Sequence, residues 1–160
     1  MSVIPEWAPN LHPMVIHFPI VLLITAAAIE LADVVFVRPA WLDTATFLYA
    51  AGAVATIAAY VTGVQAGSTV FVPGTAHPAV DDHRSWALFT AWYFGIVVTA
   101  RVGARFAGLP PTRSLRAMLL TTGLIGVVLL QQTAERGARL VYEQGAVSYT
   151  HLTLPTTPYV

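Results

Sequence analysis

The stretch VIHFPIVLLITAAAIELADVVFV, residues 15–37, decides the fold class of this chain. It is long enough to cross a bilayer, because a membrane-spanning helix needs about 20 mostly apolar residues. Three further runs of the same character follow, at residues 42–64, 86–106 and 115–132. The sequence therefore predicts an all-α integral membrane protein with four spans.

The composition supports the same class. Of the 160 residues, 56% are hydrophobic and only 10% are charged, and the mean hydropathy is +0.68, whereas soluble domains carry about 25% charged residues. A neutral chain without lysine offers no basic patch for nucleic acid. Without cysteine there is no disulfide, iron–sulfur cluster, thiolate metal site or haem attached through CxxCH. The expected partner is the lipid bilayer, not nucleic acid.

The connections between the spans predict an up-and-down four-helix bundle. Residues 38–41 and 108–111 are short and contain prolines, which end one helix before the next begins. Short connections require antiparallel neighbours. The connection at residues 65–83 is longer and contains glycines and prolines. No period of 20–50 residues recurs, although a histidine near the start of the first and third spans hints at two related hairpins.

The chain divides into four segments. Residues 1–14 precede the four-span membrane domain at 15–133, and residues 134–147 form an amphipathic helical extension. In this extension Glu135, Arg139 and Glu143 are spaced by four, which supports a helix. It either prolongs the fourth span or lies along the membrane surface. The tail at 148–160 is rich in threonine and proline and resembles translated adaptor DNA or a disordered terminus.

The arginines predict the orientation. One side of the predicted bundle has only three of them, Arg84, Arg136 and Arg139; the other has Arg38, Arg101, Arg105, Arg113 and Arg116. The positive-inside rule places the richer side in the cytoplasm. We therefore expect a multi-pass protein of a bacterial inner membrane, with the N- and C-termini in the periplasm.

Four histidines gather on the expected periplasmic side. His12 and His17 lie at the entrance of the first span, His77 in the long connection and His83 before the third span. The first and third spans run in the same direction, so His17 and His83 are expected at similar depth. Glu135 returns to this side after the fourth span.

The residues around these histidines resemble a known family. The motif LHPMxxHFPI at residues 11–20 is similar to the signature of a bacterial membrane family called domain of unknown function 2231, and Thr62-Gly63 and Asp82-His83-Arg84 also fit it. The resemblance covers roughly residues 10–145 and brings no established activity. Some members are joined to or encoded beside Rieske or cytochrome c domains, which suggests a redox partner of that type by association only.

Three hypotheses compete for the histidines. In the first, His17 and His83 are the axial ligands of haem b in an electron-transfer subunit. In the second, imidazole and carboxylate groups bind zinc, copper or non-haem iron, with the ligands drawn from His12, His17, His77, His83 and Glu135. In the third, the histidines only form hydrogen bonds among the lipid headgroups, and the protein is a structural scaffold subunit without a cofactor. No hydrolase, kinase or metalloprotease motif is present, so a redox subunit is favoured over a stand-alone enzyme; a homo-oligomer is left open.

Other intramembrane groups have simpler expectations. Glu30 could relay protons, but pairing with an arginine such as Arg38 or Arg101 is favoured. Small residues recur every four positions along the second and third spans, so Gly63 and Gly95 are expected where helices touch.

Overall fold

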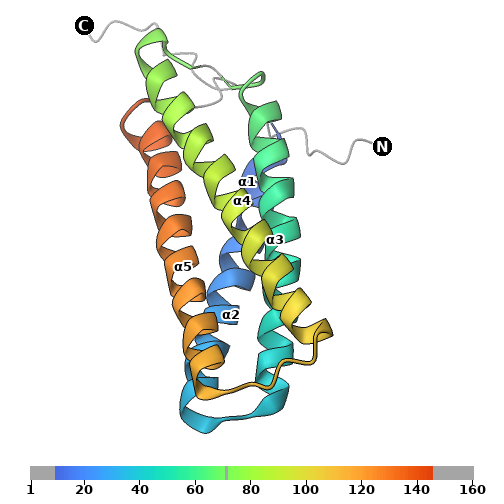
Figure 1. The fold of residues 1–160 in the computed structure, drawn as a ribbon. Coiled ribbons are helices and arrows are strands. Elements are labelled where there is room, and N and C mark those ends of the chain that lie inside the picture. The colour runs from blue at the N-terminus through green and yellow to red at the C-terminus, as the bar shows by residue number, and fades with distance from the viewer. Residues whose placement is uncertain (1–9, 71, 146–160) are drawn as a thin grey trace, which may run out of the picture.

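The computed structural model describes residues 10–70 and 72–145, and this part of the chain is helical without strands. The helices run alternately up and down, as Figure 1 shows, and confirm the all-α four-helix bundle. Four of them are long and apolar enough to cross a membrane. The elements are α1 (His12–Val15), α2 (His17–Phe36), α3 (Pro39–Ala66), η1 (Gly74–Ala76), α4 (His77–Phe106) and α5 (Arg113–Tyr142).

The first span runs from His12 to Phe36 and has a local irregularity near its start. α1 ends at Val15 and α2 begins at His17, with Ile16 between them. Pro19 explains the break, because its nitrogen has no hydrogen to donate to the carbonyl of Val15. The separate turn of α1 allows His12 to approach α3.

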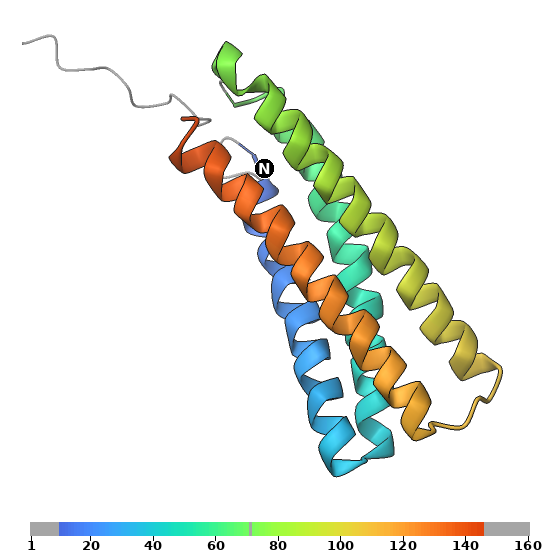
Figure 2. The same cartoon turned by 60° about the vertical axis from the view of Figure 1, so that its left-hand side comes forward.

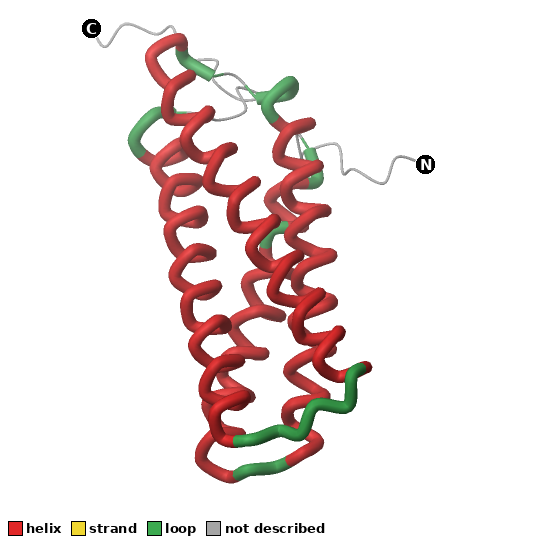
Figure 3. The backbone as a smooth tube through the Cα atoms, viewed as in Figure 1, coloured by secondary structure: helices red, strands yellow, loops and turns green. Residues whose placement is uncertain are grey.

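Short turns close the bundle at the end opposite the histidines (Figure 3). Val37 ends α2 in the left-handed conformation, with φ of 49°, and the amide of Arg38 donates to Asp33 Oδ1 at 2.9 Å. Pro39 then occupies the first turn of α3, where its missing N–H costs nothing. At the other turn, Thr112 caps α5 by accepting from the amide of Leu115 at 3.2 Å.

Two helices extend beyond the predicted spans. α4 begins at His77 rather than at Trp86, so His83 lies within the helix and the long connection is shorter than expected. α5 continues to Tyr142 without a break. The amphipathic extension therefore prolongs the fourth span instead of lying along the membrane surface. The tail at 148–160 and residues 1–9 lie outside the described residues.

The long helices form a closed ring in which α2 contacts α3 and α5, and α4 contacts the same two helices (Figure 2). The hydrophobic core is small and combines aromatic, aliphatic and small side chains: aromatic rings of α3 and α4 pack against the aliphatic and small ones. Its members are Leu23, Ala26, Tyr49, Ala53, Phe94 and Leu130. Large apolar side chains on the outer faces are exposed, as expected for surfaces that face lipid.

The two hairpins α2–α3 and α4–α5 correspond at a constant shift of 71 residues, the separation of Glu30 and Arg101. Each buried residue of α4 lies 71 positions after a buried residue of α2. In order, Thr90, Phe94, Val97 and Arg101 correspond to Pro19, Leu23, Ala26 and Glu30. Six identical pairs fall at the same shift within the two hairpins, among them His12 with His83, Gly52 with Gly123 and Thr62 with Thr133. The two hairpins are therefore related as a repeat, with equivalent helices running in the same direction.

The two glycines expected at helix contacts behave differently. A Cβ on Gly63 would lie 3.0 Å from Cε1 of His12, so this glycine does sit at a contact between α1 and α3. A Cβ on Gly95 would meet nothing within 4 Å, so the prediction for Gly95 is wrong. The four-residue spacing shows that small residues share a face but does not show which neighbour the face meets.

Gly63→Leu is expected to lower the free energy of unfolding of the detergent-solubilised protein by about 1–3 kcal/mol, because the new side chain must displace the His12 ring. Gly95→Leu is the matched control and should change stability by no more than about 0.5 kcal/mol. Equal thermal stability of the two variants would contradict the packing of His12 on Gly63.

Candidate ligand site at the histidine end

The histidine end of the bundle is the end where α1 and α4 begin and α3 and α5 finish. Here the amide of His12 donates to Oδ1 of the buried Asn10 at 3.1 Å, and Asn10 Nδ2 donates to Thr69 Oγ1 at 3.2 Å. These bonds fix the short α1 turn against the end of α3. The His12 ring lies on the backbone of Gly63.

The bonding around His12 favours one tautomer. Nδ1 of His12 lies 3.3 Å from the hydroxyl oxygen of Thr62, and that hydroxyl can donate its own proton to the carbonyl of Ala58 at 2.9 Å. With its proton used in this way, the Thr62 oxygen accepts from Nδ1–H. In this tautomer the lone pair of His12 is on Nε2.

His83 repeats this arrangement in the second hairpin. Its Nδ1 lies 3.1 Å from the carbonyl oxygen of Thr133, which can only accept, so Nδ1 again holds the proton. A Cβ on Gly137 would lie 3.0 Å from Cε1 of His83, so this ring also lies on a glycine. In both hairpins the bonded threonine follows its histidine by 50 residues.

His12 and His83 therefore occupy equivalent positions in the two hairpins. Both rings are half-buried. No hydrogen bond to Nε2 of either ring is formed by the residues that the structure describes. A neutral imidazole with its Nδ1–H bonded to an oxygen and a bare Nε2 is the form in which histidine binds a metal.

The other predicted ligands are placed differently. His17 begins α2 with an exposed side chain, and His77 begins α4, also exposed. Glu135 is exposed and accepts from Arg139 Nη2 at 2.6 Å. Within residues 10–70 and 72–145, no three histidine, aspartate or glutamate side chains come together as a group that could hold a metal ion. The structure thus leaves the side chain of His17 exposed and makes His12 the counterpart of His83 in the other hairpin.

A buried polar cluster lies toward the opposite end and joins all four long helices. Glu30 of α2 pairs with Arg101 of α4 and accepts from the hydroxyl of Tyr49 of α3 at 3.1 Å. Arg101 Nη2 also donates to Leu119 O at 2.6 Å and Thr122 Oγ1 at 3.2 Å, both on α5. The Arg101 guanidinium lies 4.2 Å from the centre of the Tyr49 ring. Pairing of Glu30 with Arg101 confirms the favoured expectation for Glu30.

A second buried pair lies nearer that end, where Asp33 pairs with Arg116. Arg116 Nε also donates to the carbonyl of Pro111 at 3.1 Å. This pair was not predicted from the sequence, although the position of Asp33 one turn after Glu30 indicates that two acids of α2 share a face. Both pairs neutralise charges that would be costly inside a membrane.

These features define the class of the protein as a multi-pass membrane protein with buried ion pairs at one end and two equivalent, half-buried histidines at the other. The chain belongs to the DUF2231 family, described as predicted membrane protein, whose family model matches residues 8–149. This confirms the resemblance carried by the histidine motif. No curated protein and no solved structure gives a significant match to the chain.

Proposed function

We propose that this protein is an electron-transfer subunit that binds haem b at the histidine end, with Nε2 of His12 and Nε2 of His83 as the axial ligands. The single observation that favours this function is the shared geometry of the two imidazoles, in which each Nδ1 lies within hydrogen-bond distance of a threonine oxygen. Nε2 of His12 and Nε2 of His83 would hold the haem, and the bound haem would supply one-electron oxidation and reduction. His17 is the alternative ligand opposite His83.

The chain's own residues have definite tasks in this proposal. Thr62 and the Thr133 carbonyl hold the tautomer and ring orientation of the two ligands, as oxygen partners of metal-bound histidines do. Gly63 and Gly137 leave room for the rings beside the α3 and α5 backbones. The distant Glu30–Arg101 pair holds the two hairpins together.

The proposed location is a bacterial inner membrane with the histidine end and both termini in the periplasm. Five of the eight arginines lie toward the opposite end. Two of these, Arg101 and Arg116, are used in buried pairs, so the exposed arginines that support this orientation are Arg38, Arg105 and Arg113. A Rieske or cytochrome c domain in the periplasm would reach a haem at the histidine end.

The haem content of the purified protein tests the proposal. Protein expressed with a haem precursor and purified in detergent should contain one b-type haem per chain, measured as the pyridine haemochrome. Its Soret band should shift on reduction with dithionite, because both axial positions are occupied by imidazole. Colourless protein from cells with ample haem would contradict the proposal and favour the scaffold hypothesis.

A further inference from the structure

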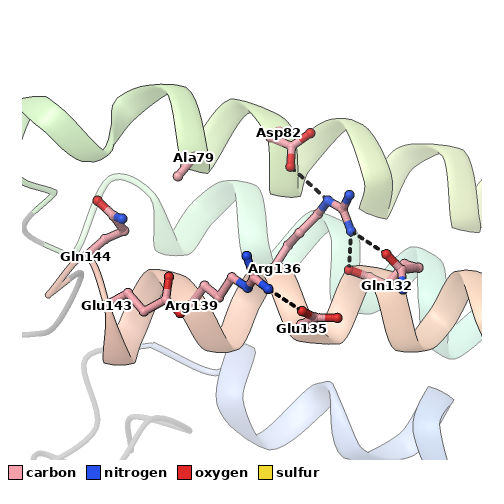
Figure 4. Close-up of a pocket in the computed structure, with 8 residues that line it drawn as sticks. All are labelled: Ala79, Asp82, Gln132, Glu135, Arg136, Arg139, Glu143 and Gln144. Carbon is pink, nitrogen blue, oxygen red and sulfur yellow. Dashed lines mark hydrogen bonds and ion pairs between the residues drawn. The ribbon is translucent and has the colours of Figure 1, made fainter.

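A polar pocket opens between α4 and α5 at the histidine end. Its volume is about 330 Å³, and Figure 4 shows charged side chains of both signs around it. The polar residues of its lining are Asp82 of α4, then Gln132, Glu135, Arg136 and Arg139 of α5, and Glu143 and Gln144 directly after α5. No step of the proposed electron transfer uses these residues.

One wall of the pocket is held in place by Arg136. Its Nε donates to Asp82 Oδ2 at 2.8 Å, and its Nη1 donates to the carbonyl and side-chain oxygens of Gln132 at 2.9 and 3.0 Å. Its guanidinium also stacks over Trp86, 4.0 Å from the ring centre. This wall is therefore preorganised across the two helices.

The remaining charges lie on the other side of the pocket and are only partly used. Arg139 donates through Nη2 to Glu135, which leaves the other guanidinium N–H groups for a ligand. Glu143 follows Arg139 by one helical turn and forms no ion pair among the described residues. The cationic guanidinium of Arg139 and the anionic carboxylate of Glu143 thus line the same pocket, and this combination suits a small zwitterionic ligand.

The pocket lies at the depth of lipid headgroups. α5 has 30 residues, which span about 45 Å at 1.5 Å per residue, whereas the hydrocarbon core of a bilayer is about 30 Å thick. The last turns of α5 must therefore project into the headgroup layer. Trp86, which packs under Arg136, is the residue type enriched at that boundary.

We propose that this pocket binds the headgroup of phosphatidylethanolamine, independently of any haem. The phosphate accepts from the Arg139 guanidinium, and the primary ammonium donates to the carboxylates of Glu143 and Asp82. Phosphatidylcholine offers no ammonium N–H for these carboxylates, and phosphatidylglycerol offers no cation. The pocket is therefore selective for a lipid that has both a phosphate and a primary amine.

Lipid retention by the full chain tests this proposal. Protein is incubated with mixed micelles containing equal amounts of phosphatidylethanolamine, phosphatidylcholine and phosphatidylglycerol, and bound lipid is counted by native mass spectrometry. Wild-type protein should retain phosphatidylethanolamine several-fold over the other two. Arg139→Gln and Glu143→Gln should each abolish this preference, because each removes one of the two charges that the headgroup meets.

Arg113→Gln is the matched control, since Arg113 is an exposed arginine at the opposite end of the same helix. It should keep the wild-type preference. Thermal stability in lipid-free detergent should be the same for all three variants, which excludes unfolding as the cause of lost binding. Equal retention of the three lipids, a preference for phosphatidylglycerol, or an unchanged preference in Arg139→Gln would overturn the proposal.

Discussion

Glu30→Ala is expected to lower the free energy of unfolding by about 3–5 kcal/mol, because it leaves the Arg101 guanidinium without its counter-charge inside the bundle. Both side chains are almost completely buried. The loss also frees the Tyr49 hydroxyl, which donates to Glu30. Arg101→Ala should cost a similar amount, since it strands the Glu30 carboxylate. Thermal unfolding in detergent, followed by circular dichroism, measures both losses.

The exposed pair Arg105–Asp43 provides the control. It also joins α4 to α3, at 2.7 Å, but its side chains are 68% and 54% exposed. Arg105→Ala should therefore change stability by no more than about 1 kcal/mol. The double variant Glu30→Ala/Arg101→Ala should lose less than the sum of the single losses, because the two charges are coupled. Equal effects of Glu30→Ala and Arg105→Ala would show that the buried pair does not hold the hairpins together.

Much of the fold follows from the sequence alone. The number of spans, the up-and-down order and the pairing of Glu30 with Arg101 follow from hydropathy, short proline-containing turns and the cost of an unpaired charge in a membrane. The start of α4 was missed because its first turns are polar: Asp81, Asp82 and Arg84 lie on a helix that projects beyond the apolar region. Hydropathy finds the part of a helix inside the membrane, not the whole helix.

The repeat and the histidine pair needed the structure. Few identities survive between the hairpins, and a shift of 71 residues becomes evident only when burial is compared along α2 and α4. The same shift relates His12 to His83, whereas His17 corresponds to Leu88. Depth along the membrane predicts His17 as the partner of His83. In the structure the His12 ring contacts α3, and the side chain of His17 is exposed.

His12→Ala and His83→Ala are each expected to remove most of the haem from the purified protein. Each change deletes one axial nitrogen, and a single remaining imidazole holds a b-type haem far less tightly because no covalent bond retains it. His17→Ala is the matched control, one turn away on an exposed side chain, and should keep the wild-type haem content. Added imidazole should restore binding in His12→Gly, which a purely structural role of His12 would not allow.

The most direct test of the histidine pair is the dithionite-reduced minus oxidised absorption spectrum of His12→Ala and His17→Ala, recorded beside the wild type at equal protein concentration. If His12 and His83 are the ligands, the haem bands disappear in His12→Ala and persist in His17→Ala. Bands that persist in His12→Ala and disappear in His17→Ala would contradict the assignment of His12 and establish His17 as the ligand opposite His83.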